Sequence, residues 1–287
     1  MGVNAVAAGR HGRCKPVVVA LRGRPEDEML TIAHPTALTD ADALPFAHSV
    51  ALTRDTGGKL FAIHASNDPS AQERMPEAQP LLMRWGNDQT IAYERLLHSC
   101  CEDPVDTLLD ALRRVNPDLL MVATSNRKGL LSMFVDSRAK ALARNCSAPT
   151  LFFPPGSGSL LDDEGHYALE RIVVPFRDSL AAKEGIRKAT WLAEAVGAAQ
   201  VELTMVHLGP ESERPKLDLP DHPSWSFSVR NVDKPMEEAV AELTHDHCMV
   251  VMASRGHDTV GDILFGTDAE RVLLRAHSPV LVAHVQG

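Results

Sequence analysis

The stretch DLLMVATSNRKGLLSMFVDSRAKALARNCSAPTLFF, residues 118 to 153, can be laid without a gap over CMVVMASRGHDTVGDILFGTDAERVLLRAHSPVLVA, residues 248 to 283. Few residues are identical. Both stretches nevertheless read as an apolar run, a polar loop, a helix and a second apolar run that follows a proline. Self-similarity of this kind is typical of a duplicated unit. The sequence therefore predicts two copies of one fold.

The beginnings of the two halves also correspond. The runs VVVALR at 17–22 and IVVPFR at 172–177 are short and rich in β-branched residues, which is typical of buried parallel strands. A helical stretch follows each run, at 40–55 and 180–196, and glycines stand where each helix should end. The next strands are predicted in KLFAIHA and VELTMVH.

Strands that alternate with helices predict parallel sheets covered by helices on both faces. We expect an α/β fold with two tandem, doubly wound, five-stranded parallel sheets related by a pseudo-twofold axis. The domains are placed at 15–153 and 167–287, and the Pro-, Gly- and Ser-rich segment 154–166 is predicted to be an exposed linker. The last strands, TLFF at 150–153 and VLVAHV at 280–285, should pair within the chain as an internal pseudo-dimer.

The composition argues against several classes of partner. A net charge of −9 disfavours nucleic acid and anionic membrane surfaces, which both require a basic face. The chain contains no apolar run near the roughly 18 residues of a membrane span. Its five cysteines are irregularly spaced and no cationic leader precedes an apolar core, so we expect a cytoplasmic protein.

The stretch MASRGHDTVGDILFGTDAER, residues 252 to 271, follows a predicted strand, and doubly wound sheets bind ligands outside the carboxyl ends of their strands. Gly256 permits a bend and Gly266 permits close approach to the helix that follows. Thr267 and Glu270 form a T-x-x-E pattern that marks a helix start. Such an end attracts phosphate. The alternative is that the glycines merely connect a strand to a helix.

The spacing A-x-x-G-x(9)-G-T, carried by Ala253, Gly256, Gly266 and Thr267, resembles the G-x-x-G-x(9)-G-[S/T] signature of universal stress proteins. The resemblance covers both halves and is strongest in the second, so the chain looks like a tandem member of that family. It implies ATP binding, with the loop around the triphosphate and the strand ends around adenine and ribose. Mg²⁺ would accompany the nucleotide.

Two positions depart from the family pattern. Ala253 replaces the first glycine, and Arg177 stands where nucleotide-binding members have an aspartate. Asp178 comes one residue late, and on a strand such a shift turns the side chain to the other face. Arg177 could instead offer its cation to phosphate. The candidate nucleotide-binding residues are Pro175, Phe176, Arg177, Asp178, Ala253, Arg255, Gly256, His257, Gly266, Thr267 and Asp268.

The first half matches the signature less well. Its corresponding residues are Ala123, Asn126, Asp136 and Ser137, and the carboxylate of Asp136 would repel a phosphate. Arg22 repeats the departure at Arg177. We therefore expect one nucleotide site per chain, in the second half.

The other polar residues give weaker indications of a functional site. His64 and His207 lie at equivalent strand ends and are more simply structural, and the HDHC run at 245–248 lacks the usual spacing of a zinc site. No nucleophile-and-base arrangement follows from local spacing, so no catalytic residue is assigned and at most weak ATP hydrolysis is expected.

Two functions remain open at this point. The first is a cytoplasmic stress-response sensor or adaptor that binds ATP or another adenine nucleotide in its second half. The alternative is a dimerisation or interaction module of the same family that binds no nucleotide. The sequence leaves open whether two chains form a homodimer.

Overall fold

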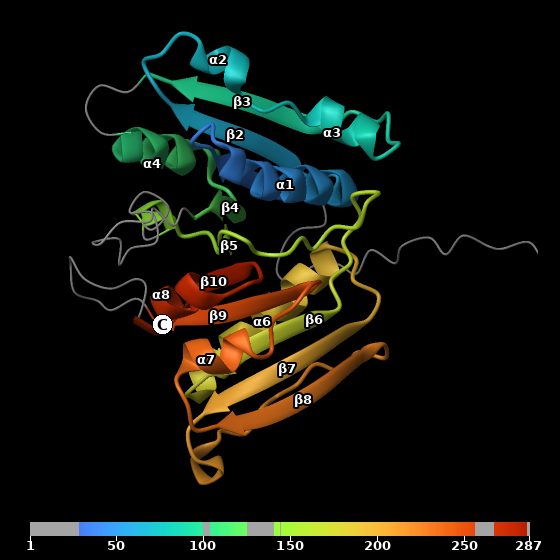
Figure 1. The fold of residues 1–287 in the computed structure, drawn as a ribbon, viewed down its shortest axis with the longest axis vertical. Coiled ribbons are helices and arrows are strands. Elements are labelled where there is room, and N and C mark those ends of the chain that lie inside the picture. Colours follow the sequence, from blue (N-terminus) through green and yellow to red (C-terminus); the bar gives the residue numbers. More distant parts are fainter. Residues whose placement is uncertain (1–28, 100–103, 125–140, 144, 256–266, 286–287) are drawn as a thin grey trace, which may run out of the picture.

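The computed structural model describes residues 29–99, 104–124, 141–143, 145–255 and 267–285. Its strands form one ten-stranded sheet in the order β3-β2-β1-β4-β5-β10-β9-β6-β7-β8 (Figure 1). The strands are β1 Thr31–Pro35, β2 Lys59–Ala65, β3 Ala92–His98, β4 Leu119–Ala123, β5 Thr150–Phe153, β6 Arg171–Phe176, β7 Val201–Leu208, β8 Trp225–Val232, β9 Cys248–Arg255 and β10 Val280–Val285.

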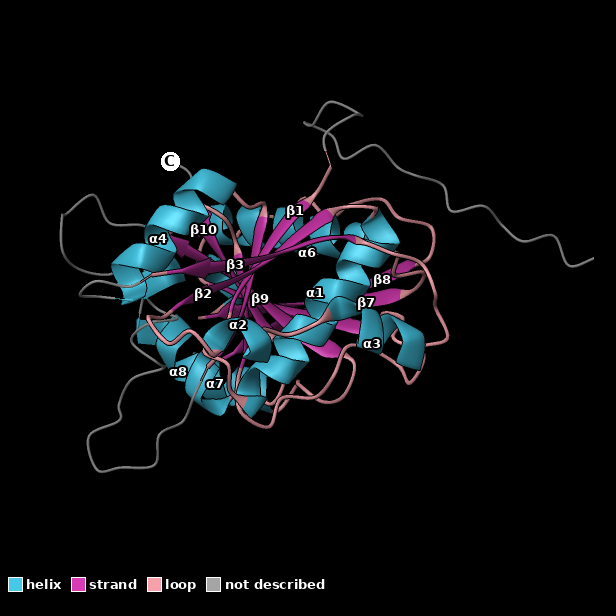
Figure 2. Ribbon diagram, turned by 90° about the horizontal axis from the view of Figure 1, so that it is seen from above, coloured by secondary structure: helices cyan, strands magenta, loops and turns pink. Residues whose placement is uncertain are grey.

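Helices cover both faces of the sheet (Figure 2). The helices are α1 Ala43–Thr56, α2 Ala71–Arg74, α3 Ala78–Arg84, α4 Pro104–Val115, α6 Ser179–Ala195, α7 Met236–Ala241 and α8 Thr267–Arg275. Helices α1, α3 and α6 contribute to one buried apolar cluster, and α4, α7 and α8 to a second. Gly57 and Gly197 end α1 and α6 with positive φ angles of 66° and 65°, as their sequence positions predict.

The two halves meet edge to edge at β5 and β10, which run antiparallel and pair Val280 with Phe152 and Val282 with Thr150. The strand pairs inside each half are parallel. Outward from this seam the strand order is the same in both directions, as a twofold arrangement requires. The predicted fold and the predicted pairing of the last strands are confirmed, although the two sheets join into one.

The first strand of the first half lies elsewhere than the sequence predicts. Strand β1 occupies the central place, whereas the run at 17–22 lies outside the described residues. In the register, Pro35 pairs with Ile63 just as Pro175 pairs with Val206. The residue equivalent to Arg177 is therefore Ala37, and the comparison of Arg177 with Arg22 is wrong.

The segment between the halves, residues 154–169, is here called the strap. Part of the strap is buried. Leu160 is only 2% exposed and lies in the apolar cluster of α1 and α6. Gly165 is buried against the indole ring of Trp85, and Arg54 of α1 donates a hydrogen bond of 2.9 Å to the Gly165 carbonyl. The expectation of an exposed linker therefore holds for residues 155–156, 162–164 and 166 and is wrong for Pro154, Leu160 and Gly165. The domain boundaries themselves remain a prediction.

Candidate functional site

The candidate site lies where the strand connections of the second half diverge. Strands β6 and β9 are parallel neighbours, but β6 leads to β7 on one side and β9 leads to β10 on the other. This is the point at which open α/β sheets form a crevice outside their carboxyl ends. Strand β9 runs to Arg255, two residues further than its apolar pattern predicts, because Ser254 and Arg255 pair with β10.

The last residues of β6 are part of the core. Pro175 and Phe176 are both buried, and the Phe176 side chain is 1% exposed. Its ring centroid lies 5.3 Å from that of His207 on the neighbouring strand. Phe176 therefore supports the end of the sheet from within, and its side chain is not at the surface of the crevice.

Asp178 begins a helix. Its backbone is extended, with φ −138° and ψ 170°, and its Oδ1 accepts hydrogen bonds from the Leu180 and Ala181 amides at 3.0 and 2.9 Å. This is the geometry of an N-cap, which satisfies two of the amides that lack partners at the start of α6. The described contacts of Asp178 are thus structural.

Arg177, which follows β6, pairs with the first turn of α8. Its Nε donates to Oδ2 of Asp268 at 3.2 Å, and the two side chains are 55% and 31% exposed. Asp268 is the second residue of α8, whose N-terminus carries partial positive charge and amides without intrahelical partners. The structure therefore brings together two candidate residues 91 positions apart and places a guanidinium beside the first turn of α8.

The remaining candidates are described only in part. Ala253 is half-buried on β9. Arg255 ends β9 and Thr267 begins α8, as its T-x-x-E pattern predicts for the helix start. Gly256, His257 and Gly266 lie outside the described residues, so their role stays a prediction.

The central strand of the first half is followed by a loop that wraps around a carboxylate. Oδ2 of Asp42, which is 8% exposed, accepts from the Ala37 and Thr39 amides at 3.1 and 2.9 Å and from the Thr36 and Thr39 hydroxyls at 3.1 and 3.2 Å. Leu38 adopts a positive φ of 59° as the loop wraps around this carboxylate. Sequence reasoning missed Asp42, although Thr39-x-x-Asp42 resembles the spacing of a capping box. Asn126, Asp136 and Ser137 lie outside the described residues.

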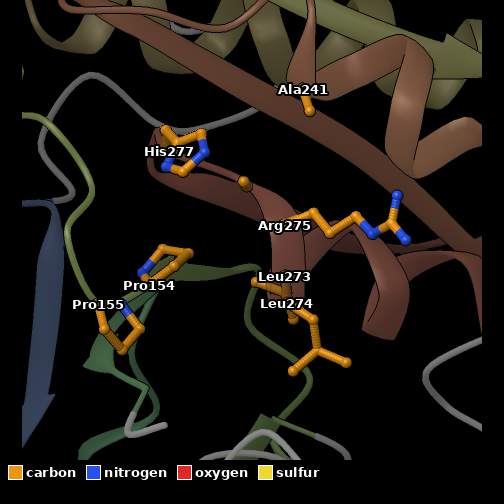
Figure 3. Close-up of a pocket in the computed structure, with 8 residues that line it drawn as sticks. Pro154, Pro155, Ala241, Leu273, Leu274, Arg275 and His277 are labelled. Atoms are coloured by element: carbon orange, nitrogen blue, oxygen red, sulfur yellow. The ribbon is translucent and has the colours of Figure 1, made fainter.

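A cavity of about 390 Å³ lies at the opposite edge of the second half (Figure 3). The ends of α7 and α8 and the start of the strap form its walls, with Ala241, His277 and Pro154 among the lining residues. Arg275, also in the lining, points away from Pro154 and Pro155 in Figure 3. This cavity and the Arg177–Asp268 pair therefore lie at opposite ends of α8.

His64, His207 and Cys248 are held by contacts within the fold. His64 Nδ1 lies 2.8 Å from the Thr36 carbonyl, and His207 Nδ1 lies 3.2 Å from Oδ1 of Asn231. Burial raises the pKa of the Cys248 thiol to about 11, which disfavours the reactive thiolate. Across the described ranges, no group of three or more His, Cys, Asp and Glu side chains is placed to hold a metal ion.

No helix within those ranges has the length and apolar character needed to cross a membrane.

Comparisons with known proteins agree with this architecture. The model of the universal stress protein family matches residues 211–284, from the loop before β8 to β10. A universal stress protein from Archaeoglobus fulgidus DSM 4304 is 14% identical with a TM-score of 0.60, over 89% of this chain and 98% of that one. A protein of unknown function from Pseudomonas aeruginosa PAO1 is 11% identical with a TM-score of 0.61, over 90% and 93% of the two chains.

A universal stress protein in complex with cAMP matches 43% of this chain and 94% of its own, with 19% identity and a TM-score of 0.36. No curated protein matches the sequence significantly. At these identities the structural likeness concerns the fold, and the family match concerns the second half. The second half thus matches the universal stress protein family model over residues 211–284, and the chain as a whole shares the fold of a universal stress protein of known structure.

Proposed function

We propose that the second half binds an adenine nucleotide at the crevice between β6 and β9, and that the protein acts as a cytoplasmic stress-response sensor or adaptor. The observation that carries this proposal is the Arg177–Asp268 pair, which holds a guanidinium beside the start of α8. Arginine binds phosphate through parallel hydrogen bonds, and a helix N-terminus adds donors of the same polarity. A phosphate chain is the ligand that best fits both.

Binding a phosphate requires an exchange of partners at Arg177. In the structure the Arg177 guanidinium pairs with the Asp268 carboxylate. A phosphate that replaces this carboxylate is also negatively charged. The nucleotide therefore competes with Asp268 for Arg177, while Asp268 also repels the incoming anion. ATP, with Mg²⁺ and the predicted glycine loop at 256 and 266, is the proposed ligand.

Isothermal titration of the full chain with MgATP tests the proposal. Replacing Arg177 by alanine should weaken ATP binding roughly 10- to 100-fold, because a hydrogen bond to a charged group contributes about 1.5–3 kcal/mol. Adenosine binding should change far less. Asp268→Asn should strengthen ATP binding by a few-fold, since it removes the competing charge.

Arg187→Ala is the matched control, because Arg187 is also an exposed arginine paired with a carboxylate, that of Glu184 on α6 at 2.8 Å. It should leave ATP affinity unchanged. Mass spectrometry of protein purified without added nucleotide should detect ATP or ADP. No binding at millimolar ATP would remove the proposal.

A second candidate function is an interaction module that binds no nucleotide. One observation favours it, namely that Asp178 caps α6 and Arg177 pairs with Asp268, so these polar groups at the crevice have partners within the chain. A flat titration with ATP, ADP and AMP in the folded full chain would support this second candidate.

A further inference from the structure

The strap is held to α1 by a buried histidine that the nucleotide proposal does not use. His48 is 0% exposed, and its Nε2 accepts a hydrogen bond of 3.0 Å from the backbone amide of Leu160. Its Nδ1 donates to the carbonyl of Leu44, one turn earlier in α1, at 2.8 Å. The Tyr167 hydroxyl donates to the His48 carbonyl at 2.8 Å and attaches the returning arm of the strap to the same residue.

These partners fix the protonation state of the ring. The Leu44 carbonyl can only accept, so Nδ1 carries the hydrogen, and the Leu160 amide can only donate, so Nε2 must present its lone pair. A protonated ring would turn Nε2 into a second donor facing the Leu160 N–H group. Burial lowers the pKa of His48 from 6.5 to about 4, while the bond to Leu44 acts in the opposite direction.

The groups packed around the ring are mostly apolar or neutral. The Phe153 ring of β5 and the Tyr167 ring of the strap lie 4.7 and 5.8 Å from the imidazole, measured between centroids. Burial raises the pKa of Tyr167 well above its usual value, so this hydroxyl stays neutral. Strand β5 carries no ionisable side chain. The other ionisable residues of α1 and the strap are Arg54, Asp55, Asp162, Asp163, Glu164 and His166.

We propose that His48 makes the strap an acid-sensitive clasp, in which protonation of the imidazole releases the Leu160 amide and loosens the strap from α1. An imidazole freed from the clasp binds a proton below about pH 6.5, whereas the clasped one does so only near pH 4. Acid therefore favours the loosened strap between these values. The ratio of loosened to clasped strap should rise roughly 20-fold from pH 7 to pH 5.

Opening would expose apolar side chains that belong to the shared core. Leu160 and Leu169 of the strap are 2% and 4% exposed and lie in the same cluster as Phe46 of α1 and Ile186 of α6. Loosening the strap thus uncovers part of an apolar cluster to which helices of both halves contribute. This inference stands apart from the nucleotide proposal and does not depend on it.

Amide hydrogen exchange of the full chain, followed by mass spectrometry at pH 7, 6 and 5, tests the clasp. After correction for intrinsic exchange rates, protection of peptides from the strap should fall roughly 20-fold relative to peptides from α6. His48→Gln, which stays neutral over this range, should abolish the pH dependence. His64→Gln, at a half-buried histidine that bonds to Thr36, should retain it.

Strap protection that is the same at pH 7 and pH 5, or that falls equally in His48→Gln, would overturn the proposal. If His48→Gln does not fold, nuclear magnetic resonance of the uniformly ¹⁵N-labelled, unmodified chain decides the matter. The His48 ring and the Leu160 amide should then titrate together. Loss of Leu160 protection while His48 stays neutral would equally overturn the clasp.

Discussion

The carboxyl ends of the two central strands, β1 and β6, have the same place in the sheet and different surroundings. After Pro35 the chain passes through a longer loop before α1 begins at Ala43, and this loop wraps around Asp42. After Pro175 the chain enters α6 at Ser179, and Arg177 remains to reach α8. The difference shows that the two halves keep one strand order while the segments after their central strands make different polar contacts.

The largest expected change in the free energy of unfolding comes from removing the Asp42 carboxylate in the first half. Asp42→Ala leaves two amides and two hydroxyls without their buried acceptor, so the free energy of unfolding should fall by about 3–5 kcal/mol. Urea unfolding measures this change. Asp40→Ala, an exposed carboxylate in the same turn, should cost less than about 0.5 kcal/mol. A loss below about 1 kcal/mol for Asp42→Ala would show that Asp42 does not hold the loop.

The next effect tests whether the strap belongs to the first half. Gly165 and Gly156 have nearly equal φ angles, 76° and 77°, but a Cβ on Gly165 would lie 2.2 Å from the Trp85 ring whereas one on Gly156 meets nothing within 4 Å. Gly156→Ala should cost about 1 kcal/mol for its backbone alone. Gly165→Ala should cost about 1–3 kcal/mol more. Equal losses of unfolding free energy in the two variants would mean that the strap does not press on Trp85.

The smallest effect concerns the edge of the second half. Asp178→Ala removes the cap of α6 and should lower the free energy of unfolding by about 1 kcal/mol, while Asp178→Asn should keep most of it. Because Asp178 is a cap, ATP affinity should change less than about twofold in Asp178→Ala. A tenfold weaker ATP affinity in a folded variant would show that Asp178 contacts the nucleotide. Asp178 would then share the role proposed for Arg177.

Much of the fold could be predicted from the sequence. The match of residues 118–153 with 248–283 needs no gap, and it contains the strands that meet at the seam. The first strand could not be placed, because TIAHP includes His34 and Pro35 and has two β-branched residues, whereas the run at 17–22 begins with three consecutive valines. Tertiary pairing with β2 and β4 outweighs local propensity there.

The contacts that define the candidate site are long-range. Arg177 and Asp268 are 91 residues apart, so no local sequence pattern predicts their contact. The packing of Leu160 on His48 spans 112 residues and is likewise invisible to composition, which marks the strap as Pro-, Gly- and Ser-rich. Loop composition predicts where a chain turns, and only the folded structure shows what that turn packs against.

The seam between β5 and β10 has one last consequence. Both strands belong to one chain, so the effective concentration of one edge for the other is set by the tether and does not change on dilution. In an assembly of two identical chains, each substitution would appear on both sides of such an edge. Here β5 and β10 are different segments of one chain, so a substitution in one half leaves the other half unchanged.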